Sequence, residues 1–166
     1  MRTRVGYCGG EAPSPTYRRI GDHSEALQLE FDAERLPYAA LLELTAGLHD
    51  GSRPAHSRQY RSAIFTHSDE QLRAALAARK GAHTAVEPLR EFFQAEDYHQ
   101  KYRLRRHPAL IAELGFSDSD LVSSTLAARL NGFVAAPSEE QLVAFRSASL
   151  PAAALAKLEA ILAGRF

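Results

Sequence analysis

The first 25 residues restrict the fold more than any other part of the chain. A short apolar segment, Val5-Gly-Tyr7, leads into Cys8 and the pair Gly9-Gly10, and a loop with two prolines follows at 13–17. Adjacent glycines remove two side chains and permit positive φ angles, so the backbone can turn tightly and another molecule can approach it closely. We therefore predict a strand over 2–7 that ends in a turn accessible to a ligand.

Cys8 is the only cysteine of the chain and allows two interpretations. Free cysteine is among the most buried residue types, so it can be an inert core residue. It can also be a reactive thiol, because the neighbouring glycines leave room for a reactant. A single cysteine excludes an internal disulfide and a four-thiolate zinc site and suits a reducing compartment, so we expect a cytoplasmic protein.

Composition narrows the classes of protein that the chain can represent. Its 166 residues suffice for one domain, or one domain with an appendage, and 20 basic residues balance 20 acidic ones. This balance gives no basic field for nucleic acid or an anionic membrane. No apolar run approaches the roughly 20 residues that span a bilayer, and Met1-Arg-Thr-Arg4 leads into glycines rather than a signal peptide. We expect neither nucleic acid nor a membrane as a partner.

Hydrophobic periodicity separates a mixed first part from a helical second part. Leu27, Leu29 and Phe31 alternate with polar residues, as in a half-buried strand. Ser68-Asp-Glu-Gln71 and Ser138-Glu-Glu-Gln141 are capping boxes that open helices. The patterns predict strands at 2–7, 26–31, 59–66 and 84–89, helices at 37–48, 68–80, 117–130, 138–148 and 151–162, and a loop entering a short helix at 92–102. We expect an α+β core over 1–106 and a helical C-terminal extension over 107–166 packed on the core.

Seven short stretches, in order along residues 4–102, resemble the peptide methionine sulfoxide reductases of the A type. They extend over about 60% of the chain. The stretches are Arg4-Val-Gly-Tyr-Cys-Gly-Gly10, Pro13-x-Pro-Thr-Tyr17, His23-Ser-Glu25, Tyr38-x-x-Leu41-Leu42, His49-Asp50, Gln59-Tyr-Arg-Ser-Ala-Ile64 and Ala95-Glu-Asp-Tyr-His-Gln100. The resemblance implies an α+β fold with two layers around a mixed sheet. It also implies an oxidoreductase that converts methionine S-sulfoxide to methionine.

The resemblance assigns roles to three side chains. Glu25 corresponds to the buried carboxyl that protonates the sulfoxide oxygen, and Tyr17 and Tyr60 correspond to the hydroxyls that bind this oxygen. The chemistry requires such groups, because the oxygen must gain a proton as the sulfur is attacked. The substrate-binding residues that we expect in or beside the matched motifs are Tyr7, Gly9, Gly10, His49, His56 and Gln59.

The chain departs from the family at the nucleophile. The family's nucleophilic cysteine belongs to a Gly-Cys-Phe-Trp motif, which goes with an initial strand and helix; the chain begins after this motif and contains no Trp. We therefore expect an N-terminally truncated variant in which Cys8 is a relocated nucleophile. The loop between Tyr17 and Glu25 is also shorter than in the family, and Pro54-Ala-His-Ser57 replaces the usual Gly-Asn-Asp stretch.

The resemblance implies a thiol reductant and no bound cofactor. Attack on a small-molecule or peptide sulfoxide would leave Cys8 as a sulfenic acid. Because the chain has no second cysteine, an external thiol, thioredoxin or glutathione, would have to reduce this acid.

Two other classes of function are alternatives. Cysteine with two or three histidines is a reasonable ligand set for zinc, iron or copper, although no close histidine pair occurs. The candidate ligands are Cys8, His23, His49 and His56. The second alternative is a non-catalytic binding module in which the pocket recognises a small polar ligand.

The helical extension has a predicted role of its own. Loss of the initial strand and helix would expose an apolar face of the core, so we expect the helices of 107–166 to cover this gap or to build a homodimer contact. Their apolar side chains would then replace a wall of the pocket: Phe116, Leu126, Leu130 and Phe145. The alternative is a helical bundle packed on its own.

Overall fold

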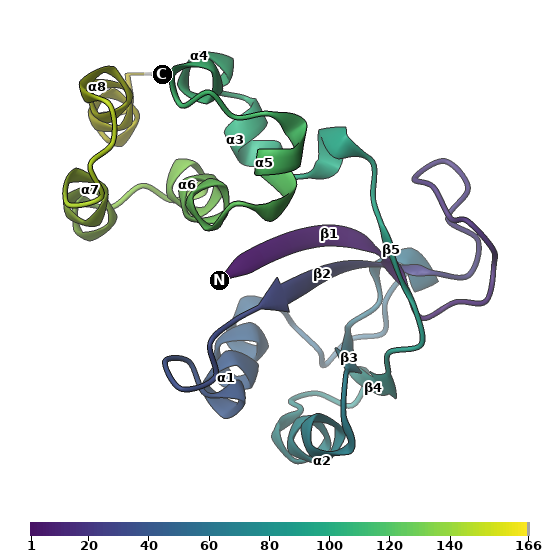
Figure 1. The fold of residues 1–166 in the computed structure, drawn as a ribbon. Helices are drawn as coiled ribbons and strands as arrows, with labels where there is room; N and C mark the ends of the chain where they lie inside the picture. Colours follow the sequence, from purple (N-terminus) through teal and green to yellow (C-terminus); the bar gives the residue numbers. More distant parts are fainter. Residues whose placement is uncertain (166) are drawn as a thin grey trace. The chain divides into compact units, whose positions relative to one another are not determined.

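The computed structural model describes residues 1–165, in which five strands belong to two separate sheets (Figure 1). Strands β1 (Arg2–Cys8), β2 (Ser24–Glu30) and β5 (Phe92–Gln94) form a sheet in the order β2-β1-β5. Strand β1 pairs antiparallel with β5, and Cys8 lies opposite Phe92. The second sheet pairs β3 (Ala63–Thr66) and β4 (Ala85–Pro88) in parallel.

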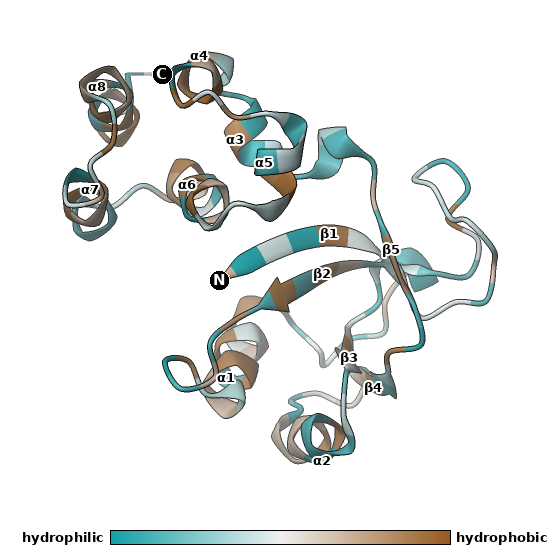
Figure 2. Ribbon diagram, viewed as in Figure 1, coloured by the Kyte–Doolittle hydropathy of each residue, from teal (hydrophilic) through white to brown (hydrophobic). Residues whose placement is uncertain are grey.

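Two helices accompany these strands. Helix α1 (Tyr38–Leu48) begins after Pro37, and α2 (Asp69–Ala78) begins after Ser68, whose side chain accepts a hydrogen bond from the Gln71 amide. Helix α1 contacts α2, and α2 contacts both β3 and β4. Figure 2 shows that much of α1 and the arrowhead end of β2 are hydrophobic. These helices confirm the predicted α+β class.

Two predictions in this part of the chain were wrong in detail. The strand predicted at 59–66 begins only at Ala63, because Arg58–Tyr60 form a 3-10 turn, η1. The segment predicted as a loop at 92 onward contains β5, which has three residues and therefore shows no periodicity. Pairing with β1 creates this strand, and the Ala95 amide extends it by donating to the Val5 carbonyl at 3.0 Å.

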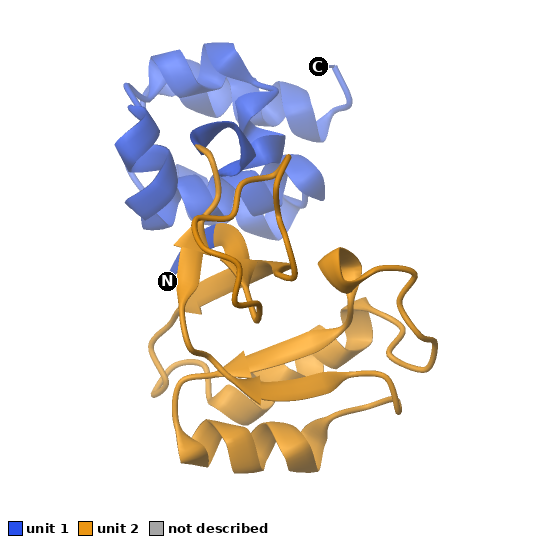
Figure 3. Cartoon of the chain, turned by 90° about the vertical axis from the view of Figure 1, so that its right-hand side faces the viewer, with its two compact units in different colours: residues 1–4, 97–166 blue, residues 5–96 orange. Residues whose placement is uncertain are grey.

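Close contacts divide the chain into two compact units (Figure 3). Residues 5–96 form one unit, here called the mixed unit, and residues 1–4 with 97–166 form the other, the helical unit. The boundary therefore falls before residue 97, whereas the sequence pattern predicts it after residue 106. The packing of the extension on the core stays a prediction.

The helical unit has a hydrophobic core of its own. Its buried residues include Leu104, Leu130, Phe133, Phe145 and Leu158. The elements that supply this core and its flanks are the 3-10 turn η2 (Asp97–His99), α3 (Tyr102–Arg105), α4 (Pro108–Glu113), α5 (Asp118–Ser123), α6 (Thr125–Ala135), α7 (Glu139–Arg146) and α8 (Ala152–Leu162). No helix among the described residues is long and apolar enough to cross a membrane.

The predicted helix at 117–130 is in fact two helices. Ser124 has an extended backbone (φ −76°, ψ 131°) and caps α6 by accepting a hydrogen bond from the Ala127 amide. Asn131-Gly132 does not end α6, because the Asn131 side chain accepts a hydrogen bond from the Leu104 amide and Phe133 lies in the core. The hydrogen bond of Asn131 and the burial of Phe133 therefore favour a helix that continues to Ala135.

Candidate functional site

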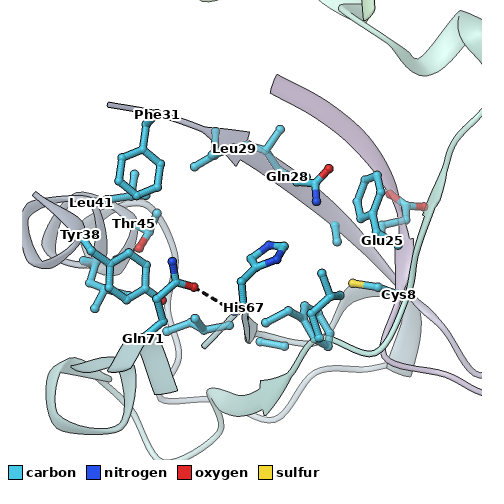
Figure 4. Close-up of a pocket in the computed structure, with 18 of the residues that line it drawn as sticks. Cys8, Glu25, Gln28, Leu29, Phe31, Tyr38, Leu41, Thr45, His67 and Gln71 are labelled. Atoms are coloured by element: carbon cyan, nitrogen blue, oxygen red, sulfur yellow. Dashed lines mark hydrogen bonds between the residues drawn. The ribbon is translucent and has the colours of Figure 1, made fainter. Parts of the chain in front are cut away.

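A cavity of about 320 Å³ opens in the mixed unit between β2, β3 and α1 (Figure 4). Most of its wall is apolar, and a few polar side chains interrupt it. The lining residues are Cys8, Glu25, Ala26, Leu27, Gln28, Leu29, Phe31, Tyr38, Leu41, Leu42, Thr45, His49, Arg61, Ala63, Ile64, Phe65, His67, Gln71, Leu89 and Phe92. None of the four extension residues expected to complete a wall is among them: Leu130 and Phe145 belong to the core of the helical unit, and Phe116 and Leu126 pack against it.

Cys8 is the last residue of β1, and its sulfur lines this cavity. The residue is only 1% exposed, and burial raises the pKa of its thiol to about 11, although the nearby Arg61 charge acts in the opposite direction. The thiol is therefore protonated at neutral pH. Figure 4 shows the sulfur pointing into the cavity.

Arg61 is a cavity residue that the sequence analysis did not single out. Its guanidinium binds Glu87 through two contacts, Nη1 to Oε1 at 2.5 Å and Nη2 to Oε2 at 2.8 Å, and Nε donates to Ser24 Oγ at 2.9 Å. The guanidinium also lies 5.5 Å from the centroid of the Phe65 ring. These contacts hold a positive charge near Cys8 and keep the pKa of the Glu87 carboxyl below its usual range. Its place in the Gln59–Ile64 motif was the available signal.

Glu25 lies in an exposed cluster with Tyr17 and Tyr60, the two tyrosines whose hydroxyls are predicted to bind the sulfoxide oxygen. Gln59 Nε2 donates to Glu25 Oε1 at 2.7 Å and to the Tyr60 hydroxyl at 3.1 Å. The Glu25 charge and a hydrogen bond with Tyr17 raise the pKa of Tyr60. Tyr17 and Tyr60 are 43% and 51% exposed, and neither lines the cavity. Glu25 is also exposed, so the expected burial of this carboxyl is wrong.

The glycine turn after β1 is packed against its own neighbours. Gly9 has φ 78°, and a Cβ there would lie 2.5 Å from Phe65 Cε1. Its carbonyl accepts a hydrogen bond from Arg58 Nη2 at 2.7 Å, and the Gly10 amide donates to His23 Nδ1 at 3.2 Å. Neither glycine lines the cavity, so the turn positions Cys8 rather than contacting the cavity itself.

The other expected substrate-binding residues lie in different places. Tyr7 is buried and donates from its hydroxyl to Glu96 Oε2 at 2.7 Å. His49 lines the cavity, but its ring is held by the Thr45 carbonyl and the Ser62 hydroxyl, each at 2.8 Å. His56 stacks at a tilt against Tyr60, outside the cavity wall.

The proposed metal ligands do not come together. His23 is buried, with Nε2 2.8 Å from the Ala12 carbonyl, and His49 is bound to Ser62 as described above. Among residues 1–165, no three or more His, Cys, Asp or Glu side chains are grouped so that they could hold a metal ion. The metal alternative therefore has no structural basis in the described residues.

Comparisons with known proteins agree with this fold. A family model described as peptide methionine sulfoxide reductase matches residues 1–123. Peptide methionine sulfoxide reductase A5 of Arabidopsis thaliana is 38% identical over an alignment of 150 positions that covers 81% of this chain and 59% of the relative. Peptide methionine sulfoxide reductase MsrA of Methanothermobacter thermautotrophicus is 38% identical over 127 residues, covering 65% of this chain and 75% of the relative.

Solved structures give the same result. Methionine sulfoxide reductase A of Corynebacterium diphtheriae is 30% identical with a TM-score of 0.52, covering 69% of this chain and 65% of that chain. Mxr1 of Saccharomyces cerevisiae in its reduced form is 31% identical with a TM-score of 0.50, covering 64% of this chain and 71% of that chain. The chain spans 59% of the length of the Arabidopsis relative that it matches. The family match over residues 1–123 and these identities establish that the chain belongs to the peptide methionine sulfoxide reductase family.

Proposed function

We propose that the chain reduces methionine S-sulfoxide, or a related small-molecule or peptide sulfoxide, with Cys8 as the nucleophile. One observation carries this proposal: Cys8 and Glu25 line the same cavity, and Glu25 is linked through Gln59 to the Tyr60 hydroxyl. A thiol, a carboxyl and a phenol are the groups that sulfoxide reduction requires. Family membership supports the same reaction.

The roles follow from the chemistry of the reaction. The Cys8 sulfur attacks the sulfoxide sulfur, while Glu25 supplies a proton to the oxygen and the Tyr17 and Tyr60 hydroxyls bind that oxygen. In net terms the oxygen passes to Cys8, so a thiol and a sulfoxide give a sulfenic acid and a thioether. Two equivalents of an external thiol then restore Cys8 and release water and a disulfide.

Burial of Cys8 makes the proposed reaction slow at neutral pH. With a pKa of about 11, very little of the Cys8 thiol is ionised at pH 7. Because the thiolate is the nucleophile, this small fraction slows the attack on the sulfoxide. The positive charge of Arg61 stabilises the Cys8 thiolate and so lowers the Cys8 pKa, which burial raises. We propose a cytoplasmic reductase with thioredoxin or glutathione as the reductant; a homodimer stays a prediction.

Steady-state turnover of L-methionine S-sulfoxide with dithiothreitol tests the proposal. We expect Cys8→Ser to lose at least about 100-fold in kcat and Tyr60→Phe about tenfold, as for the loss of a nucleophile and of one hydrogen-bond donor. Tyr102→Phe, which alters an exposed tyrosine of the helical unit, is the matched control and should keep full activity. Unchanged turnover in Cys8→Ser would rule out Cys8 as the nucleophile.

The neutral state of Cys8 favours one second candidate, a binding module. A protonated thiol in a cavity can donate a weak hydrogen bond to a sulfoxide without reacting. In that case calorimetric titration with methionine S-sulfoxide would show binding to the unmodified protein, and no methionine would form with dithiothreitol present.

A further inference from the structure

Tyr17 lies at the tip of a narrow two-residue turn. Thr16 and Arg19 pair across this turn, with the Thr16 amide 3.3 Å from the Arg19 carbonyl and the Arg19 amide 3.0 Å from the Thr16 carbonyl. The Tyr17 side chain is 43% exposed, so packing alone holds it weakly. A residue at an exposed tip keeps one position only if its backbone is attached to the rest of the fold.

Glu96 provides this attachment. Its Oε1 accepts a hydrogen bond from the Tyr17 amide at 3.0 Å, although 79 positions separate the two residues. Its Oε2 accepts a hydrogen bond from the Tyr7 hydroxyl at 2.7 Å. Hydrogen bonds to a carboxylate are shorter than those between neutral groups and about twice as strong. The carboxylate therefore joins the tip of the turn to β1.

The carboxylate is itself held by β1. Tyr7 belongs to this strand and is only 2% exposed. Glu96 follows Ala95, whose amide donates to the Val5 carbonyl at 3.0 Å and so keeps this part of the chain beside β1. All of these residues belong to the mixed unit. The carboxylate thus has a fixed place from which it can hold the turn.

The hydroxyl of Tyr17 meets the proposed oxygen-binding cluster. It forms a hydrogen bond with Tyr60, and this bond contributes to the raised pKa of Tyr60. Gln59 donates both to the Tyr60 hydroxyl and to Glu25. Glu96 does not line the cavity. It binds the backbone of Tyr17, whereas the groups that would contact the sulfoxide lie at the hydroxyl end of this residue.

We propose that Glu96 is a positioning residue that holds the Tyr17 amide and so keeps the Tyr17 hydroxyl against Tyr60, where both bind the sulfoxide oxygen. Its effect on turnover rests on the proposed function, whereas the pairing of the two tyrosines does not. Glu96 acts by accepting hydrogen bonds rather than by charge or proton transfer. Glu96→Gln can keep both contacts, because the amide oxygen accepts from Tyr17 and the amide nitrogen can donate to the Tyr7 hydroxyl.

Steady-state turnover of L-methionine S-sulfoxide with dithiothreitol separates positioning from a catalytic role. Glu96→Ala removes both contacts, and we expect kcat to fall about tenfold, as for the loss of one hydrogen bond. Glu96→Gln should stay within about twofold of the unsubstituted protein. Glu96→Leu, which fills a similar volume without an acceptor, replaces Glu96→Ala if that variant does not fold. An equal loss in Glu96→Gln would overturn the proposal, because the charge would then matter.

A double variant tests whether Glu96 acts through Tyr17. Tyr17→Phe removes the hydroxyl and should also lower kcat about tenfold. If Glu96 places that hydroxyl, Glu96→Ala should change kcat less than about twofold in the Tyr17→Phe background. Independent effects would multiply to a loss of about 100-fold and would overturn the proposal. Glu91→Ala alters an exposed carboxylate of the mixed unit and is the matched control, with full activity expected.

Titration of Tyr60 gives a second measurement that needs no turnover. Carbon-13 NMR of the tyrosine Cζ atoms follows the ionisation of each phenol, and Tyr60→Phe identifies the Tyr60 signal. Because the Tyr17 hydroxyl contributes to the raised Tyr60 pKa, Tyr17→Phe and Glu96→Ala should lower this pKa equally, while Glu96→Gln should not change it.

The two measurements distinguish failure of the positioning role from failure of the reductase. A lowered Tyr60 pKa in Glu96→Ala, in a protein that forms no methionine, would support the positioning role and refute the reductase. An unchanged Tyr60 pKa in Glu96→Ala or in Tyr17→Phe would overturn the positioning role, whatever the turnover.

Discussion

Arg61 and Glu87 form a two-point ion pair, with one contact at 2.5 Å and the other at 2.8 Å. The pair lies close enough to Cys8 to act on its thiol in opposite directions: the Arg61 charge lowers the Cys8 pKa, and the Glu87 charge raises it. Both effects are smaller than that of burial, so the pair holds a cation near the sulfur without making the thiol acidic.

Glu87→Gln should make Cys8 more reactive. The substitution removes the negative charge and leaves Arg61, so the Cys8 pKa should fall and alkylation by iodoacetamide at pH 8 should accelerate about threefold. Glu113→Gln, in α4 of the helical unit, is the control. An unchanged alkylation rate in Glu87→Gln would show that the ion pair does not act on the thiol.

The stability of the protein should fall at high pH because of Cys8. The folded-state pKa of about 11 lies above the ordinary value of 9.0, so the folded state holds its proton more tightly than the unfolded state. The stabilisation is complete below pH 9 and is lost between pH 9 and 11, for a total of about 3 kcal/mol. Urea unfolding of the wild type and Cys8→Ala across this range measures it, and parallel curves would contradict the assignment.

Lys101 should produce the opposite pH dependence. It is 5% exposed, its Nζ donates to the Thr3 carbonyl at 2.6 Å, and burial lowers its pKa to about 8 from 10.5. The charged form is therefore disfavoured in the folded state, and this destabilisation, about 3 kcal/mol, should be relieved as pH rises from 8 to 10.5. Lys101→Met should abolish this rise in urea unfolding experiments. If the variant shows the same rise as the wild type, Lys101 is not its source.

Gly9 should not tolerate a side chain. Its φ is 78°, and Phe65 Cε1 lies 2.5 Å from the position that a Cβ would take. We therefore expect Gly9→Ala to lower the free energy of unfolding by about 1–3 kcal/mol. Gly47→Ala in α1 is the matched control, because a Cβ there meets no atom within 4 Å; it should raise stability by up to about 1 kcal/mol. Equal stability of the two variants would contradict the tight packing of the turn.

The sequence predicted elements well where they carry their own periodicity or caps. Helices α1, α2, α7 and α8 lie close to their expected bounds, since Ser68 and Ser138 cap two of them. Strand β5 was not predicted, because its three residues are too few to show a hydrophobic pattern. The strand forms by pairing with β1. The break at Ser124 was also missed, although it has a local signal, because the Ser124 side chain caps α6 by accepting a hydrogen bond from the Ala127 amide.

The site was harder to predict because burial depends on partners distant in sequence. The matched motifs identified Cys8 and Glu25, which do line one cavity. They did not reveal that Glu25 is exposed, or that Arg61 is fixed by Glu87, a residue 26 positions away. The sequence also does not predict that β2 and β3 belong to different sheets, because this depends on how the strands pair in the folded chain.

A single-turnover experiment tests the central claim most directly. The reduced protein is mixed with L-methionine S-sulfoxide without any thiol, then treated with dimedone, which traps sulfenic acids, and its peptides are analysed by mass spectrometry. The account predicts one equivalent of methionine per chain and a dimedone adduct on Cys8. Methionine formed without an adduct on Cys8, or no methionine at all, would contradict it.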